Sequence, residues 1–181
     1  MDYKARARNI ELIVLDVDGV LTGGQLIIGP AGEAMKFFHA HDGMGISLAQ
    51  QAGLYTAIVT ARESQIVAWR GTELKIRDIC QGEGDKARAV RNLMVKYDLK
   101  PEQVAYVGDD LNDLPAFNQV GLACAVGNAA PEVRDRAHYV AGKDGGQGAV
   151  REIMEMILKS QGKWDGLVQS YLAAASLHVV Q

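Results

Sequence analysis

Short apolar runs alternate with amphipathic stretches along most of this chain. The apolar runs are bounded by glycine and polar residues, which is typical of buried strands, and several stretches between them have helical spacing. The expected strands cover residues 10–15, 55–59, 76–80, 104–107, 122–126 and 139–141, and the expected helices cover residues 43–52, 63–71 and 86–97. Strands that alternate with helices in this way predict an α/β fold with a doubly wound, Rossmann-like parallel sheet.

Two segments depart from this alternation. Residues 24–28 and 33–38 are strand-like and flank Gly29-Pro30-Ala31-Gly32, which predicts a small β-hairpin flap. From Trp164 onward the apolar positions again follow helical spacing. Because 181 residues suit one well-packed domain, we expect a single domain over residues 1–163 and a C-terminal tail over residues 164–181. Docking of this tail on its own core or on a neighbouring copy, and fraying beyond Ser176, are open alternatives.

The composition narrows the class of protein. Hydrophobic residues make up 48% of the chain and charged residues 23%, as in an ordinary globular domain. A net charge of -3 without a stripe of lysine and arginine argues against a nucleic-acid surface. No run approaches the roughly 18 apolar residues of a membrane span, and no apolar signal core follows the N-terminus. Cys80 and Cys124 lie in short apolar stretches, so we expect reduced thiols in a soluble, cytoplasmic protein.

Two carboxylates directly follow the first apolar run, in the segment Leu15-Asp16-Val17-Asp18-Gly19. The alternation of a strand would place Asp16 and Asp18 on the same side, and Gly19 would allow a sharp turn. Such a pair can divide one reaction, with Asp16 as the nucleophile and Asp18 as the proton donor and acceptor. Clustered carboxylates are also the hard oxygen ligands that Mg²⁺ prefers. By itself, however, this motif fits a solvated acidic turn equally well.

Further polar residues follow other expected strands. They are Thr60, Lys86 with the preceding Gly84-Asp85, and the acidic group Asp109, Asp110 and Asp113. Each has an ordinary alternative, namely a helix cap, a surface lysine and a solvated acidic loop. Because ligands of parallel sheets lie beyond the carboxyl ends of the strands, we expect these residues to meet at one edge. Together they supply the nucleophile, metal site, positive charge and acid that phosphoryl transfer requires.

In this order, D-x-D-G-V-L-T, V-T-A-R, G-D-K and G-D-D-L-N-D resemble the four motifs of the haloacid dehalogenase superfamily of phosphatases. The resemblance implies that Asp16 forms an aspartyl-phosphate and that Asp18 protonates the leaving alcohol and then activates water. It also implies an Mg²⁺ site made by the Asp16 carboxylate, the Asp18 backbone carbonyl and Asp109. Asp110 and Asp113 would then be supporting acids.

The same resemblance implies a phosphate site. Thr60 and the Ala61 N–H would bind the phosphate, and Lys86 would balance its charge. The short spacings from Thr22 to Thr60 and from Thr60 to Lys86 leave no room for a cap domain. Since the hairpin is too small to enclose a site alone, we expect a neighbouring subunit to cover it.

Longer motifs resemble the 3-deoxy-D-manno-octulosonate 8-phosphate phosphatase family. These are F-H-x-x-D-G-x-G-I after the hairpin, Y-V-G-D-D-L-N-D, and G-G-x-G-A-V-R-E at residues 145–152 followed by Gln161-Gly162-Lys163. The resemblance implies an eight-carbon sugar acid phosphate of lipopolysaccharide synthesis as substrate. It also implies a homotetramer in which hairpins associate and tails reach neighbouring sites.

Several residues are candidates for recognising the sugar acid. Arg62 and Arg70 suit a carboxylate, although both could belong to a solvated helix face. The family's substrate loop maps onto His39, Ala40, His41, Asp42 and Gly43. The chain departs from the family pattern at His41 and Gln147, where relatives have arginine, and at Ala61, where they have glycine. The histidines lack the clustered partners of a zinc site.

Two other functions compete with this interpretation. One is a phosphatase for a nine-carbon sialic-type sugar acid 9-phosphate, whose relatives tend to have glutamate at the position of Arg62. The other is a non-catalytic, phosphatase-like assembly module. The intact set Asp16, Asp18, Lys86 and Asp109 argues against such a module, because it brings together charges that are costly to hold.

Overall fold

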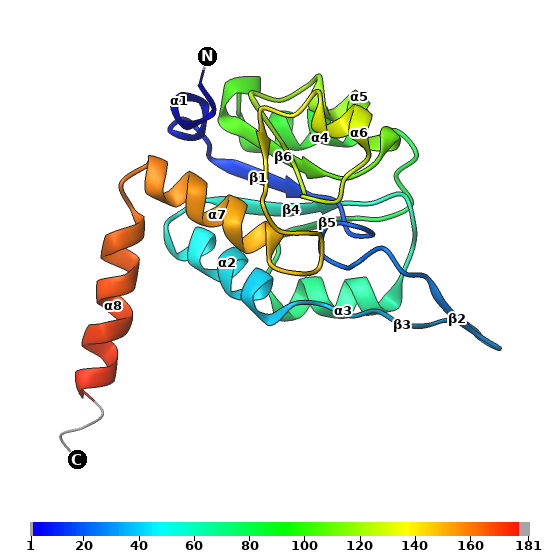
Figure 1. Ribbon diagram of the computed structural model, residues 1–181, viewed down its shortest axis with the longest axis horizontal. Helices are drawn as coiled ribbons and strands as arrows, with labels where there is room; N and C mark the ends of the chain where they lie inside the picture. The colour runs from blue at the N-terminus through cyan, green and yellow to red at the C-terminus, as the bar shows by residue number, and fades with distance from the viewer. Residues whose placement is uncertain (1, 178–181) are drawn as a thin grey trace.

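The computed structural model describes residues 2–177, and its centre is a six-stranded parallel sheet (Figure 1). The strand order is β5-β4-β1-β6-β7-β8. The strands are β1 (Leu12–Leu15), β4 (Tyr55–Val59), β5 (Asp78–Cys80), β6 (Val104–Gly108), β7 (Leu122–Ala125) and β8 (Tyr139–Val140). Every neighbouring pair is parallel. The predicted doubly wound α/β fold is therefore confirmed.

Helices cover both faces of the sheet. On one face lie α2 (Ala40–Gln51), α3 (Gln65–Glu73) and α7 (Ala149–Ser160), and on the other lie α4 (Lys86–Tyr97), α5 (Leu114–Phe117) and α6 (Pro131–Arg134) (Figure 1). The four residues of β1 are fully buried, as expected for a central strand covered on both sides. The chain leaves β1 toward β4 and later returns to the other side of β1 as β6, so the winding direction reverses at the carboxyl ends of β1 and β6.

Several element boundaries differ from the predicted ones for local reasons. The helix α3 begins at Gln65 because Ser64 caps it, with Ser64 Oγ accepting the Val67 N–H at 3.3 Å. The strand β5 begins two residues later than predicted, because Lys75 has a positive φ and Ile76 N still donates to Gly71 O. The helices α1 (Tyr3–Ala7) and α7, the short helices α5 and α6, and the 3₁₀ turns Pro101–Gln103 and Leu111–Asp113 were not predicted.

The predicted hairpin is formed by β2 (Ile27–Gly29) and β3 (Gly32–Met35), which pair antiparallel. We call residues 24–38 the flap hairpin. It extends away from the body of the molecule (Figure 1), and no cap domain is inserted among the described residues. Its apolar side chains Leu26, Ile28, Met35 and Phe37 are exposed. Because an isolated two-stranded ribbon is marginally stable in water, its base must be held by other parts of the molecule.

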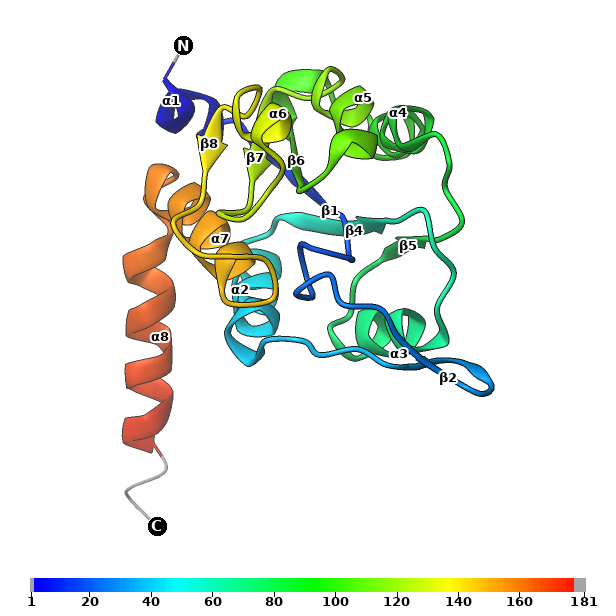
Figure 2. The ribbon, with the colours of Figure 1, turned by 45° about the vertical axis from the view of Figure 1, so that its right-hand side comes forward.

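The C-terminal segment forms the helix α8 (Trp164–Leu177), which projects beside the domain (Figure 2). Its first residue, Trp164, packs against α7, since the cationic groups of Arg151 and Lys159 each lie 5.2 Å from the centroid of the Trp164 ring. Further along, Gln51 Nε2 donates to Tyr171 Oη at 3.0 Å. The fraying considered beyond Ser176 falls mostly on residues 178–181, outside those described. Within residues 2–177, no helix is both long enough and apolar enough to cross a membrane.

Glycines let the loop after β8 approach the turn after β1. A Cβ atom on Gly145 would lie 1.6 Å from the Gly19 carbonyl oxygen, and Gly146 N donates to Val20 O at 2.9 Å.

We predict that Gly145→Ala lowers the free energy of unfolding by at least the ~1–3 kcal/mol of an overpacked site, measured by urea denaturation. Gly166→Ala is the control, because its Cβ would meet no neighbour within 4 Å. Equal stabilities of the two variants would contradict this prediction.

Candidate active site

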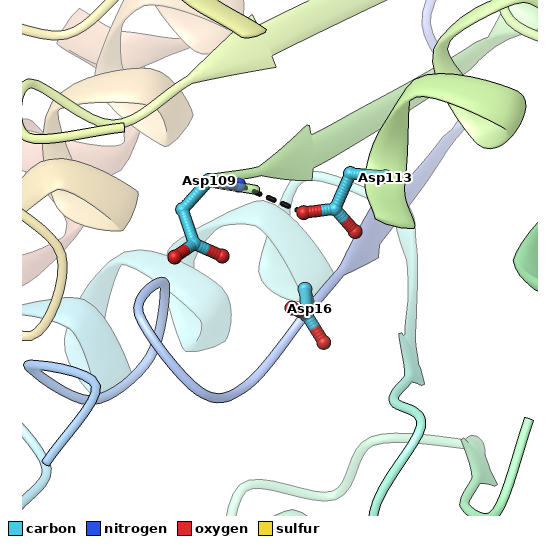
Figure 3. Close-up of side chains that lie close together, drawn as sticks. All are labelled: Asp16, Asp109 and Asp113. Carbon is cyan, nitrogen blue, oxygen red and sulfur yellow. Dashed lines mark hydrogen bonds between the residues drawn. The ribbon is translucent and has the colours of Figure 1, made fainter. Parts of the chain in front are cut away.

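A pocket of about 250 Å³ opens where β1, β4 and β6 end. The predicted residues that line it are Asp16, Asp18, Thr60, Ala61, Arg62, Lys86, Asp109 and Asp110. These residues come from four separate parts of the sequence, and the parallel sheet brings them together because the strands end at one edge. Asp113 does not line the pocket, but its carboxylate lies close to those of Asp16 and Asp109 (Figure 3).

A buried lysine connects two of the acids. Lys86 is the first residue of α4, and its side chain is only 2% exposed. Its Nζ lies 3.0 Å from Asp16 Oδ2 and donates to Asp113 Oδ1 at 2.6 Å. Burial alone would lower the pKa of Lys86, but Asp16 and Asp113 outweigh it and raise this pKa. The lysine is therefore a permanent positive charge beside the Asp16 carboxylate.

The Asp113 carboxylate is fully occupied by donors. Its Oδ1 accepts from Lys86 and from Tyr106 Oη at 2.8 Å, and its Oδ2 accepts the N–H groups of Asp109 at 2.8 Å and Asp110 at 3.2 Å (Figure 3). These four donors use the acceptor positions of both oxygens. Asp113 therefore positions Lys86 and the loop after β6, and this supports its predicted role as a supporting acid. Asp110 is exposed and caps the 3₁₀ turn through the Leu111 N–H at 2.7 Å.

Asp109, in contrast, has a buried oxygen without a partner among the described residues. This atom is Oδ1, and carboxylate oxygens of Asp16, Asp109 and Asp113 lie within 4.8 Å of one another (Figure 3). Desolvation, followed by the charge of Asp113, raises the pKa of Asp16 to about 6 and that of Asp109 to about 7. Three acids face one lysine here, so the site has an excess of negative charge that a divalent cation would balance.

The donor set fits Mg²⁺. Asp16 and Asp109 offer hard carboxylate oxygens, whereas the oxygens of Asp113 are already used. Gly19, with φ of +93°, makes the close approach possible, because a Cβ atom there would lie 1.9 Å from Asp109 Oδ2. When bound, Mg²⁺ would supply Lewis-acid charge for the phosphoryl oxygens.

The second acid of the motif, Asp18, faces two cations. Lys36 of the flap hairpin hydrogen-bonds to Asp18 Oδ1, and Arg62 Nε lies 3.7 Å from Asp18 Oδ2. Lys36 Nζ also pairs with Glu33 Oε1 at 2.8 Å, and Glu33 in turn accepts a hydrogen bond from Ser64 Oγ. Burial would lower the pKa of Lys36, but its bonds to Asp18 and Glu33 raise it. Neither Lys36 nor Glu33 lies in a motif, so no pattern in the sequence indicated these two residues.

The structure shows which group of Thr60 is free to meet a phosphate. The Thr60 backbone N–H donates to Cys80 O at 2.9 Å as part of the sheet, so it is not available to a phosphate. The Thr60 side chain, which is buried at the strand end, and the Ala61 backbone both line the pocket. The Thr60 hydroxyl, the Ala61 N–H and Lys86 therefore remain the predicted phosphate contacts.

The predicted substrate loop and Arg70 do not line this pocket. Asp42 is buried and holds the start of α7, accepting the Gly148 N–H at 3.2 Å and the Arg151 N–H at 2.8 Å. Arg70 Nη1 donates to Glu73 Oε2 at 2.7 Å, and its guanidinium carbon lies 5.6 Å from the Phe38 ring. The neighbouring residues His39, Ala40, His41 and Gly43 form the entry and first turn of α2. Their predicted contact with substrate stays a prediction.

Comparisons with known proteins agree with this geometry. A family model described as haloacid dehalogenase-like hydrolase matches residues 50–153. The 3-deoxy-D-manno-octulosonate 8-phosphate phosphatase KdsC of Escherichia coli is 44% identical over 164 residues, which cover 91% of this chain and 87% of that protein. The chain belongs to this phosphatase family of haloacid dehalogenase-like hydrolases.

Solved structures of the phosphatase family have the same fold. The crystal structure of the Yersinia pestis phosphatase has a TM-score of 0.89 and 42% identity, and the match covers 91% of this chain and 89% of that one. The Moraxella catarrhalis phosphatase, solved in complex with a magnesium ion, a phosphate ion and a KDO molecule, has a TM-score of 0.91 and 38% identity, with 93% and 97% covered. The expected family and its magnesium chemistry are thus confirmed.

The raised pKa values predict how pH changes the stability of the Mg²⁺-free protein. A carboxyl group whose pKa is higher in the folded state binds its proton more tightly there. It therefore stabilises the fold at low pH, and this stabilisation is lost as pH rises from the ordinary value of 3.8 through about 7 for Asp109. We expect the free energy of unfolding to fall over this range, and to fall less in Asp109→Asn. Asp135→Asn, at an exposed position, should keep the wild-type slope.

Mg²⁺ should restore the stability that the Mg²⁺-free protein loses at neutral pH. An ion present at 100 times its dissociation constant would add about 2.7 kcal/mol to the free energy of unfolding. We predict that the Tm measured by calorimetry rises with Mg²⁺ in the wild type and in Asp135→Asn, but much less in Asp109→Asn. An equal rise in all three proteins would show that the ion binds elsewhere.

The contacts of Asp42 predict a structural effect of its removal. Asp42→Ala leaves two N–H groups of the α7 entry without an acceptor, one buried and one partly buried, and a buried group left in this way costs about 1–3 kcal/mol. We expect a clear loss of stability in urea denaturation, with an unchanged KM in the folded enzyme at low temperature. A raised KM with unchanged stability would instead support the predicted role of Asp42 in binding substrate.

Proposed function

We propose that this protein hydrolyses 3-deoxy-D-manno-octulosonate 8-phosphate to the free sugar acid and phosphate, in lipopolysaccharide precursor synthesis. The observation that carries the proposal is the buried Asp16–Lys86–Asp113 group beside Asp109, at the edge of a sheet that superposes on a relative solved with magnesium, phosphate and KDO. The enzyme is a phosphoric monoester hydrolase, and Mg²⁺ is its cofactor. A cytoplasmic location is proposed with it.

The first half-reaction uses Asp16 and Asp18. A carboxylate oxygen of Asp16 attacks phosphorus while the bond from phosphorus to the sugar oxygen breaks. Asp18 gives its proton to the departing sugar oxygen, so the sugar acid leaves as an alcohol and Asp16 carries the phosphoryl group. Lys86 holds Asp16 Oδ2 throughout, which keeps the carboxylate oriented and balances the incoming negative charge.

The second half-reaction returns the enzyme to its starting state. Asp18, now a carboxylate, takes a proton from a water molecule as the water oxygen attacks phosphorus. The bond between phosphorus and Asp16 breaks, and phosphate is released. The Thr60 hydroxyl and the Ala61 N–H are the groups that would donate to the phosphoryl oxygens in both steps. Because Asp18 serves first as the acid and then as the base, both half-reactions depend on the position of its carboxyl group.

Arg62 is the residue that we propose to recognise the sugar acid carboxylate. Its side chain is 48% exposed at the pocket, so it can turn toward a ligand without leaving a buried charge unpaired. Arg70 and residues 39–43 lie outside the pocket of their own chain. They can contact substrate only if another subunit brings them near, which is consistent with a homotetramer.

The exposed parts of the chain support this assembly. The flap hairpin presents Leu26, Ile28, Met35 and Phe37, and α8 presents Val168 and Tyr171. Apolar groups exposed in this number favour contact with another molecule. We propose that residues 164–181 act as a tail from a domain that ends at residue 163, and that it reaches a neighbouring subunit. Sedimentation that shows a fully active monomer would contradict this assembly.

Substrate screening tests the proposed function. We expect Mg²⁺-dependent phosphate release from the eight-carbon sugar acid 8-phosphate to exceed release from a nine-carbon sugar acid 9-phosphate and from neutral sugar phosphates. Asp16→Asn should abolish it. Arg62→Met should raise KM for the sugar acid phosphate by roughly 10- to 100-fold, the effect of one hydrogen bond to a charged group, while sparing p-nitrophenyl phosphate. Arg88→Met, at an exposed arginine of α4, is the control. Preference for a neutral sugar phosphate would overturn the substrate assignment.

A further inference from the structure

The flap hairpin contains one lysine, Lys36, and its side chain is 2% exposed. Its neighbours in the sequence point the other way, since Met35 is 47% and Phe37 67% exposed. Lysine is rarely so covered unless its charge is paired. Here the ammonium lies between the carboxylates of Asp18 and Glu33. The most buried charge of the hairpin is thus directed at the acid/base residue of the pocket.

A second contact attaches the same part of the hairpin to the body of the protein. Glu33 Oε2 accepts a hydrogen bond from Ser64 Oγ, and Ser64 is the N-cap of α3. Ser64 N donates in turn to Gln81 Oε1 at 2.7 Å, just beyond the end of β5. A continuous series of polar contacts therefore runs from the edge of the sheet through Ser64, Glu33 and Lys36 to Asp18.

Lys36 is the direct partner of Asp18, whereas the other nearby cation is not. Arg62 Nε lies 3.7 Å from Asp18 Oδ2, which is beyond hydrogen-bond distance. Asp18 also follows the strand on a turn, with no side chain of its own loop bonded to its carboxylate among the hydrogen bonds of the described residues. Without Lys36, the carboxylate could rotate away from the position where the leaving oxygen and the attacking water must both meet it.

We propose that Lys36 is a positioning residue that fixes the Asp18 carboxylate for proton transfer, and that through it the flap hairpin becomes part of the catalytic machinery. This inference rests on the proposed function, because it concerns the acid/base step of that reaction. Lys36 does not line the pocket, although Gly24 and Leu26 of the same hairpin do. Lys36 therefore acts on the reaction through Asp18 and not by touching the substrate.

Lys36→Met is the test variant, and Lys36→Arg and Glu33→Gln accompany it. Lys96→Met is the control, because Lys96 also pairs with an aspartate, Asp78, but does so with a half-exposed side chain at the β5 edge of the sheet. For the sugar acid phosphate, we expect Lys36→Met to lower kcat about 10- to 100-fold, as misplacement of a reacting group does, with KM within about twofold of wild type. Lys36→Arg should restore part of the loss, Glu33→Gln should cause a smaller one, and Lys96→Met none.

Leaving-group dependence separates positioning of Asp18 from a general loss of structure. The nitrophenolate of p-nitrophenyl phosphate departs without a proton, so its release does not need the acid, whereas hydrolysis of the aspartyl-phosphate still needs the base. Rapid mixing of Lys36→Met with this ester should therefore give a burst of about one nitrophenolate per active site, followed by slow turnover. A merely distorted site would slow the burst itself.

The experiments distinguish failure of the positioning role of Lys36 from failure of the proposed phosphatase function. A burst phase slowed as much as the steady state, a raised KM with unchanged kcat, or full activity in Lys36→Met would each overturn the positioning role while leaving the phosphatase intact. Wild-type protein without Mg²⁺-dependent activity on any phosphate ester would overturn the proposed function, and this inference with it. Circular dichroism of each variant verifies that the sheet is folded before the kinetics are compared.

Discussion

The buried ammonium of Lys86 is the interaction on which the rest of the site depends. Taking a lysine and two carboxylates out of water is costly, and the cost is offset only when every charge finds a close partner. Here Lys86 bridges Asp16 and Asp113, and Asp113 is further held by Tyr106 and two backbone N–H groups. One oxygen of Asp16, the proposed nucleophile, is therefore held by a lysine that α4 and the loop after β6 both position.

This arrangement also explains why the site needs a cation and why glycines surround it. Lys86 balances only one of three acids, so the Asp109 oxygen without a partner remains as a ligand that the fold does not satisfy. Acids can come this close only if the backbone between them carries no Cβ. Gly19 packs directly on Asp109 and Gly108 on Asp113, and any side chain at either glycine would overlap a carboxylate. The glycines therefore determine the spacing of the acids.

The sheet and the meeting of the motif acids at one edge could be predicted from the sequence, because both depend on local patterns. Strands such as 55–59 appear as uninterrupted apolar runs, and parallel strands bring whatever follows them to one edge. The other contacts depend on how separate elements pack. Nothing near Asp42 in the sequence indicates that it caps α7, about a hundred residues away, and nothing near Lys36 indicates that it faces Asp18. The pairing of the Thr60 N–H with Cys80 O likewise depends on the neighbouring strand β5.

The motif residues meet in one pocket, whereas some of the residues predicted to bind substrate lie outside it. Asp16, Asp18, Lys86 and Asp109 line this pocket together with Arg62, whereas Arg70 and Asp42 bond to other groups of the chain. The flap hairpin contacts the pocket at its base, where Lys36 bonds to Asp18. Its apolar side chains remain exposed. A surface that covers those side chains would also stiffen the base of the hairpin. Assembly could then influence proton transfer without contributing any residue to the reaction itself.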